Sequence, residues 1–218
     1  MRPLGLLSVA ALTLSGCQSQ EPTQGETSKA GQDAYGDWLE QMRHTPLKSE
    51  VAINDEYAIS AVFPKDSSVC TADSGGHVHG FYQWLESDCT AEAPGVLRPD
   101  RYLSVWADYN AAEYSRDDAV ELACSHGTSR GPLDATVPAE IGWAASCREE
   151  ESDAKEQLIV IFLSKATEAR AGFGPDNIDV MYTMTLHTDV THRDADLRTF
   201  ETFLRRLKLA GSSLTLAP

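Results

Sequence analysis

Two histidines separated by a single residue could act together as metal ligands. His77 and His79 begin the segment HVHGFYQWL (77–85), whose aromatic content favours a half-buried strand. A strand would direct both side chains to the same side, as an H-x-H pair of zinc ligands requires. Zinc needs a third or fourth ligand, which His126 or Asp73 would have to supply. The sequence does not show that either residue lies close to the histidines. We therefore interpret His77 and His79 as surface or sheet histidines and expect no metal and no other cofactor.

The same segment places aromatic rings beside the histidines. Phe81, Tyr82 and Trp84 lie between Cys70 and Cys89. Aromatic groups that are held rigidly lose little entropy on docking and dominate the energetics of many interfaces. We therefore predict that this stretch contacts a partner protein. The alternative is that the rings belong to the hydrophobic core, and we favour that alternative for Phe81 and Trp84. The candidate binding residues are His77, His79, Tyr82 and Trp84.

The tetrapeptide DSGG (73–76) resembles the nucleophile loop of chymotrypsin-like serine proteases. That family places a histidine and an aspartate before the serine, in a first barrel. Here only His44 precedes Ser74, and the chain before it is too short for such a barrel. The glycines are better explained by a turn between two strands. We see no other catalytic constellation and assign no catalytic residue.

Four cysteines follow Cys17, and an even number is typical of disulfides in an exported chain. Three pairings are possible, and the sequence leaves the choice open. Pairing of neighbours would close the shortest loops. A loop of about 20 residues stabilises a fold by roughly 3 kcal/mol, so we expect the bonds to give durability. The four residues are Cys70, Cys89, Cys124 and Cys147.

The N-terminus has the features of an export signal. A positive start, MRP, precedes an apolar stretch over residues 4–14, which is shorter than the roughly 20 residues that span a bilayer. The sequence LSGC (14–17) resembles the lipobox of bacterial lipoproteins. The resemblance implies cleavage before Cys17 and acylation of that residue. Because Gln18 follows, it also implies sorting to the outer membrane of a Gram-negative bacterium, facing the periplasm. A plain exported protein or a buried N-terminal helix is the alternative.

Acidic residues outnumber basic ones by 33 to 18, which gives a formal net charge of −15. Such a surface repels phosphate backbones and gains nothing from counterion release. We therefore expect no nucleic acid partner. The expected partners are the membrane, through the N-terminal lipid, and a basic protein.

One globular domain is the simplest organisation for 218 residues of which 42% are hydrophobic. The segment 18–31 is polar and suits a flexible tether. We assign residues 1–16 to a lipoprotein signal peptide, 17–31 to the lipidated cysteine and its tether, 32–210 to a single domain and 211–218 to a tail.

Hydrophobic periodicity predicts mostly strands in the body of the chain. The clearest helix is DADLRTFETFLRRLK (194–208), whose apolar stripe should cover one face of a sheet while its charged face stays solvated. The expected fold is α+β: a mainly antiparallel sheet covered by a C-terminal amphipathic helix, with two disulfides. Strands are predicted over 57–63, 77–85, 101–109, 141–147, 157–163 and 178–188, and further helices over 33–42 and 115–124. The strand 178–188 alternates, so its polar face, with Thr185 and His187, should meet water. Ser115, with Asp118 three residues on, should cap the helix over 115–124.

This order of elements is similar to the PsbP-like fold of some bacterial lipoproteins, through the strand YAISAVFP (57–64) and the terminal helix with F-x-x-F-L (200–204). The resemblance implies a non-catalytic envelope factor. We therefore expect a lipid-anchored periplasmic binding protein, such as an inhibitor or immunity protein for a basic envelope-directed enzyme. The alternatives are a metal-dependent envelope enzyme using His77 and His79, and a structural envelope assembly factor.

We predict that the mature protein begins at Cys17 and carries acyl chains, because the lipobox directs lipid to that thiol. Intact-mass spectrometry of protein from its native host should show the mass of the chain from Cys17 increased by acyl groups. An unmodified N-terminal methionine together with free sulfhydryls would contradict this prediction.

Overall fold

The computed structural model describes residues 46–47, 49–65, 68–74, 76–89, 100–124, 135–152, 155–164 and 178–216. All of them belong to one compact unit, Gly36–Pro218. Several predictions fall outside the described residues: the signal peptide, the acylation of Cys17, the tether, the helix over 33–42 and any role of His126.

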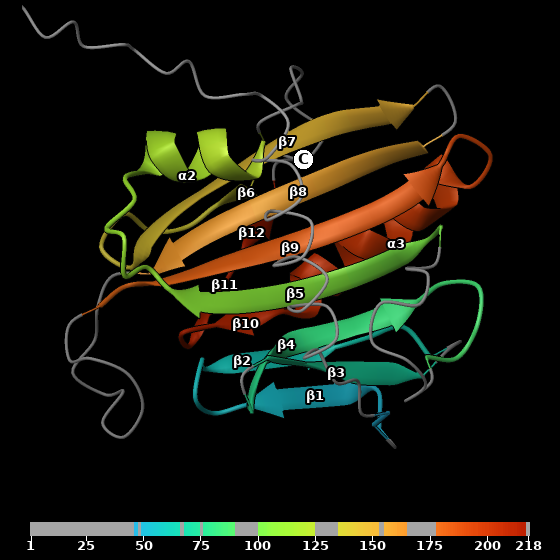
Figure 1. Cartoon of the computed structure of the whole chain (residues 1–218), viewed down its shortest axis with the longest axis horizontal. Helices are drawn as coiled ribbons and strands as arrows, with labels where there is room; N and C mark the ends of the chain where they lie inside the picture. Colours follow the sequence, from blue (N-terminus) through green and yellow to red (C-terminus); the bar gives the residue numbers. More distant parts are fainter. Residues whose placement is uncertain are drawn as a thin grey trace, which may run out of the picture. The chain divides into compact units, whose positions relative to one another are not determined.

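A six-stranded antiparallel sheet forms the centre of the fold (Figure 1). With two helices packed on it, the sheet confirms the predicted α+β class. In spatial order its strands are β3 (Val69–Ser74), β4 (His77–Trp84), β5 (Tyr102–Tyr109), β9 (Val180–Asp189), β8 (Lys155–Ser164) and β7 (Gly142–Ser152).

Strand β8 is buried on both faces, which explains its continuous apolar sequence. Leu158, Val160 and Phe162 belong to the main core on one face of the sheet. Ile159 and Ile161 belong to a smaller cluster on the other face. Both faces of the sheet therefore carry apolar side chains, and different elements pack on each face.

Helix α3 (Arg193–Arg206) covers the main-core face. Phe200, Phe203, Leu204 and the following Leu207 are fully buried, as the apolar stripe predicted. The residues after α3 also reach this core, since Leu214 and Leu216 are only 6% and 7% exposed.

A second, four-stranded sheet packs against the same core. The strand expected over 57–63 is shorter, because residues 55–58 form a turn in which the Tyr57 amide donates to Asn54 Oδ1 at 3.0 Å. Ile59 and Ala61 of β2 point into the core. The order is β1 (Val51–Asn54), β2 (Ile59–Val62), β10 (Lys208–Leu209) and β11 (Ser212–Ser213), and β12 (Thr215–Leu216) pairs separately with β6 (Ala135–Thr136).

Helix α2 (Arg116–Ala123) lies on the opposite face, over β7 and β8. Ser115 caps it as predicted: the Asp118 amide donates to Ser115 Oγ, and the Asp118 carboxylate accepts from the Ser115 amide. The helix has only eight residues and buries only Ala119 fully, so its own packing holds it weakly. The disulfide from Cys124 to Cys147 of β7 fastens its C-terminal end to the sheet.

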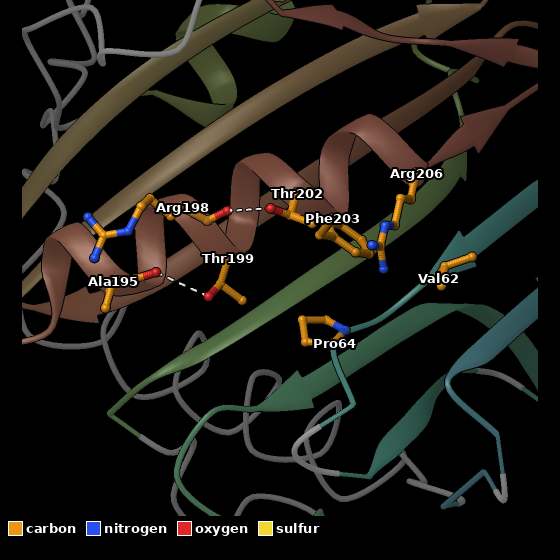
Figure 2. A pocket seen from close by; sticks show the side chains of 8 residues that line it. All are labelled: Val62, Pro64, Ala195, Arg198, Thr199, Thr202, Phe203 and Arg206. Carbon is orange, nitrogen blue, oxygen red and sulfur yellow. Dashed lines mark hydrogen bonds between the residues drawn. The ribbon is translucent and has the colours of Figure 1, made fainter.

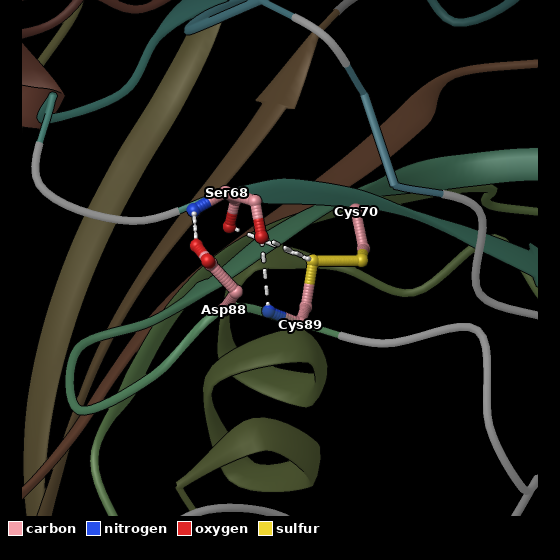
Figure 3. Close-up of a disulfide and its surroundings, with 4 residues drawn as sticks. All are labelled: Ser68, Cys70, Asp88 and Cys89. Atoms are coloured by element: carbon pink, nitrogen blue, oxygen red, sulfur yellow. Dashed lines mark hydrogen bonds between the residues drawn. A yellow bond between two sulfur atoms is a disulfide. The ribbon is translucent and has the colours of Figure 1, made fainter.

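The second disulfide joins Cys70 of β3 to Cys89, with 6.2 Å between the Cα atoms (Figure 3). Both pairs are therefore sequence neighbours, as the shortest-loop pairing suggested. Ser68 adds to this junction: its hydroxyl accepts from the Cys89 amide at 3.0 Å, and its own amide donates to Asp88 Oδ1 at 2.8 Å. The chain after β4 is thus held against the start of β3.

A buried ion pair ties α3 to the sheet. Arg101, just before β5, donates twice to Asp196 at 2.7 and 2.6 Å, and Thr188 of β9 donates to the same carboxylate at 2.6 Å. Asp196 is 4% exposed, and its hydrogen bonds raise the pKa of Arg101 above its usual value. The pair fixes the first turn of α3 against two central strands.

Replacing Cys124 and Cys147 together by alanine should lower the free energy of unfolding by about 3 kcal/mol, because the cross-link of a 23-residue separation is lost. Hydrogen exchange should show α2 amides losing protection while the β3–β4 hairpin keeps it. Equal loss in both places would contradict the local role that we assign to this disulfide.

The substitution Asp196→Ala should destabilise the protein by about 3–5 kcal/mol, because it removes the hydrogen-bonded partner of the largely buried Arg101 guanidinium and leaves that charge with the more exposed Glu86, 3.8 Å away. Urea unfolding measures the loss. The double variant Arg101→Met, Asp196→Leu should recover most of it, since the uncompensated charge is then absent. A cost for Asp196→Ala below about 1 kcal/mol would show that the pair behaves as an exposed one.

Candidate binding site

A hairpin joins β3 to β4 at the DSGG stretch. Ser74 pairs with His77, and Gly76 adopts φ +87° between them. Glycine tolerates that conformation without steric cost, which explains its presence in a tight turn. The turn expected from the sequence is thus confirmed. Two residues later the register shifts, so that His79 is the extra residue of a β-bulge.

The bulge turns His79 toward β5. Its Nδ1–H donates to Asp108 Oδ1 at 2.7 Å, and its ring stacks on Trp106 with 4.9 Å between centroids. The Ala107 carbonyl oxygen and the Tyr57 hydroxyl lie 3.2 and 3.4 Å from the same nitrogen. A catalytic dyad would need a nucleophile on Nε2, and the described side chains place none there. The arrangement orients the ring and holds Asp108 beside Trp106.

The two histidines do not converge. His77 is half-exposed and lies 3.4 Å from Glu56, whereas His79 is mostly buried and pairs with Asp108. Within the described ranges, no three histidine, cysteine, aspartate or glutamate side chains come together as a metal-binding group. The geometry of this hairpin therefore gives no support to a zinc site built on His77 and His79.

Aromatic rings gather on the sheet face opposite α3, over β3, β4 and β5. Tyr82 is 9% exposed and packs with Cys70, Cys89 and Ala72, while Trp84 and Trp106 are half-buried around this cluster. We call Tyr82, Trp84 and Trp106 the aromatic face. Phe81 points the other way, into the main core.

Carboxylates border the aromatic face. Asp108 accepts from the Trp106 indole N–H at 2.5 Å and keeps nearly half of its side chain exposed. Asp73 lies close enough to Tyr82 to raise the pKa of that phenol further, after burial has raised it most. Asp88 is exposed beside Cys89. The site thus combines flat apolar rings with negative charge.

Sequence reasoning found only part of this site. It identified Tyr82, Trp84 and His79 but not their partners Trp106 and Asp108, which β5 contributes. The signal was present, since residues 106 and 108 share one face of a strand, but the partner strand and the bulge at His79 could not be read from one segment.

The polar face of β9 also differs from expectation. Thr185 and His187, expected to meet water, are 7% and 8% exposed. His187 stacks on Tyr102 with 5.3 Å between centroids, and its Nδ1 lies 2.7 Å from the Asp100 carbonyl oxygen. Ring stacking and backbone hydrogen bonds make these polar groups compatible with burial.

A groove between α3 and β2 is a separate feature on the other side of the sheet (Figure 2). Its cavity volume is about 340 Å³. Phe203, Val62 and Pro64 supply its apolar lining, and Arg198 and Arg206 lie at its two ends (Figure 2). The sequence indicated a solvated polar face on this helix and gave no sign of the groove, because the β2 side comes from a distant segment. Ala195, Thr199 and Thr202 complete the lining.

Comparison of the chain with models of known protein families, with curated proteins and with solved structures found no match. Among the helices that the structure describes, none is both long enough and apolar enough to cross a membrane. The surfaces of the protein are therefore the basis for inferring its function.

Burial raises the pKa of Tyr57 and Tyr82 above the usual value of about 10 for a phenol. Because the folded state disfavours both phenolates, we predict full stability below about pH 10 and a falling free energy of unfolding as the pH rises above it. Urea titrations at several alkaline pH values measure this slope. The double variant Tyr57→Phe, Tyr82→Phe should flatten it.

Tyr114 offers the matched control, since it is 36% exposed, whereas Tyr57 and Tyr82 are buried. The variant Tyr114→Phe should leave the alkaline slope unchanged. A slope that Tyr114→Phe flattens as much as the double variant would show that burial of the two phenols is not its source.

Proposed function

We propose that this protein is a non-catalytic binding protein, anchored by lipid on Cys17 to the outer membrane of a Gram-negative bacterium and facing the periplasm. Its partner is a basic protein, and an inhibitor or immunity protein against a basic envelope-directed enzyme is the form that fits best. The lipobox supports the anchor, and the two disulfides agree with an oxidising compartment.

The aromatic face carries the proposal. Trp84 and Trp106 are half-buried on a part of the sheet over which the described chain places no helix. Rings on paired strands are already ordered, so docking costs little side-chain entropy. Indole faces attract lysine and arginine side chains, and the neighbouring Asp108 adds a charge of the complementary sign. These properties favour a cationic partner.

A disulfide and a histidine hold the aromatic face in place. The Cys70–Cys89 disulfide lies directly beneath the rings, and His79 holds both Asp108 and the Trp106 ring in place. A surface fixed in this way is preorganised for a single partner shape, which is what an inhibitor needs. Long-range attraction from the net charge of −15 would speed the encounter with a basic enzyme.

Capture from the envelope of the native host tests the proposal. Tagged full-length protein should enrich one basic protein, and the double variant Trp84→Ala, Trp106→Ala should reduce its recovery about tenfold or more, as expected for central interface aromatics. The control Leu122→Ala removes an exposed apolar group from α2 and should bind normally. Melting temperatures establish that the variants are folded.

Ionic strength gives a second readout on the captured pair. Association should slow markedly as salt is raised from about 0.05 to 0.5 M, because screening weakens steering between opposite charges. Salt-independent association, an acidic partner, or tryptophan variants that bind like the wild type would contradict the proposal.

A further inference from the structure

The groove between α3 and β2 differs in charge from the rest of the molecule. Arg198 and Arg206 are both exposed at its ends, and among the described residues neither forms an ion pair. By contrast, Arg101, Arg148 and Arg193 each pair with a carboxylate. In a chain of net charge −15, two unpaired guanidinium groups beside one groove form a local positive site.

The hydroxyl groups in the groove wall already have hydrogen-bond partners within the helix. Thr199 and Thr202 line it, but their hydroxyls donate to the backbone carbonyls of Ala195 and Arg198 at 3.1 and 2.8 Å. Between the arginines, the floor is apolar, with the fully buried ring of Phe203 at its base. A ligand would therefore meet hydrogen-bond donors at both ends and an apolar surface between them.

The spacing of the two arginines restricts the ligand. They are eight residues apart on one helix, which corresponds to about 12 Å along its axis at 1.5 Å per residue. At that separation, each arginine can pair with a separate acidic group of one ligand. An extended peptide rises about 3.3 Å per residue, so side chains four residues apart lie about 13 Å apart and on the same side of it. The residue midway between them points to that side as well.

We propose that this groove binds an extended segment of an acidic protein, in which two acidic residues four positions apart flank a central apolar residue. The acidic side chains pair with Arg198 and Arg206, and the apolar side chain fills the space over Phe203, Val62 and Pro64. Concave shape and two separated charges favour a peptide over the flat surface of an anionic membrane. The groove lies on the α3 side of the sheet, so it is a second surface, independent of the aromatic face and opposite to it in charge.

Fluorescence anisotropy with a synthetic peptide tests the proposal. The probe is a labelled peptide containing Glu-Ser-Leu-Ser-Glu, and the protein is the full chain with Cys17→Ser, which removes the lipid. Binding should saturate, and Arg198→Glu or Arg206→Glu should each weaken it about tenfold by replacing an attraction with a repulsion. Arg205→Glu makes the same charge change at an exposed residue outside the groove and should weaken binding less than about twofold.

Peptide variants separate the parts of the ligand. Lysines in place of the glutamates should abolish binding, and serine in place of leucine should weaken it. Three results would overturn the proposal: no saturable binding, equal weakening by Arg205→Glu and Arg198→Glu, or equal affinity for a peptide with adjacent glutamates. Arginine-dependent binding to phosphatidylglycerol vesicles without peptide binding would assign the groove to a lipid surface and overturn it as well.

Discussion

The central sheet must be covered on two faces, and the described part of the chain offers two helices, α2 and α3, for that purpose. Helix α3 and the four-stranded sheet cover one face, where side chains such as Tyr182, Phe162 and Met184 are fully buried. On the other face, α2 packs mainly on β7 and β8. Within the described part of the chain, the half of that face over β3, β4 and β5 carries no helix. This unequal cover determines where the protein can present apolar surface.

Aromatic rings and a disulfide occupy the half without a helix. The Cys70–Cys89 bond and Tyr82 fill the space next to the strands, and Trp84 and Trp106 surround them at partial exposure. A disulfide can stabilise a region that buries little apolar surface, and disulfides are typical of oxidising compartments. The same feature therefore connects the fold to its expected place in the envelope and to a rigid surface for a partner. On the opposite side of the sheet, the groove between α3 and β2 has positive charge at its ends and therefore favours an acidic ligand.

The sequence allowed good prediction of elements whose pattern is local. The apolar stripe of α3, the cap at Ser115, the glycine turn after β3 and the antiparallel strands all follow from spacing within one segment. Contacts between distant segments of the chain could not be predicted in this way. The bulge that turns His79 toward Asp108, the Arg101–Asp196 pair, burial of His187 and the groove between β2 and α3 each depend on which strands become neighbours. Hydrophobic periodicity does not contain that information.

The central claim is that the half-covered face of the sheet is where a basic partner docks. Site-specific photo-crosslinking in living cells of the native host tests it most directly. A photoreactive phenylalanine in place of Trp84 should cross-link to one basic envelope protein, and the same group in place of Leu122 on α2 should not. Equal cross-linking from both positions, or none from position 84 when the protein is correctly exported and folded, would contradict the account.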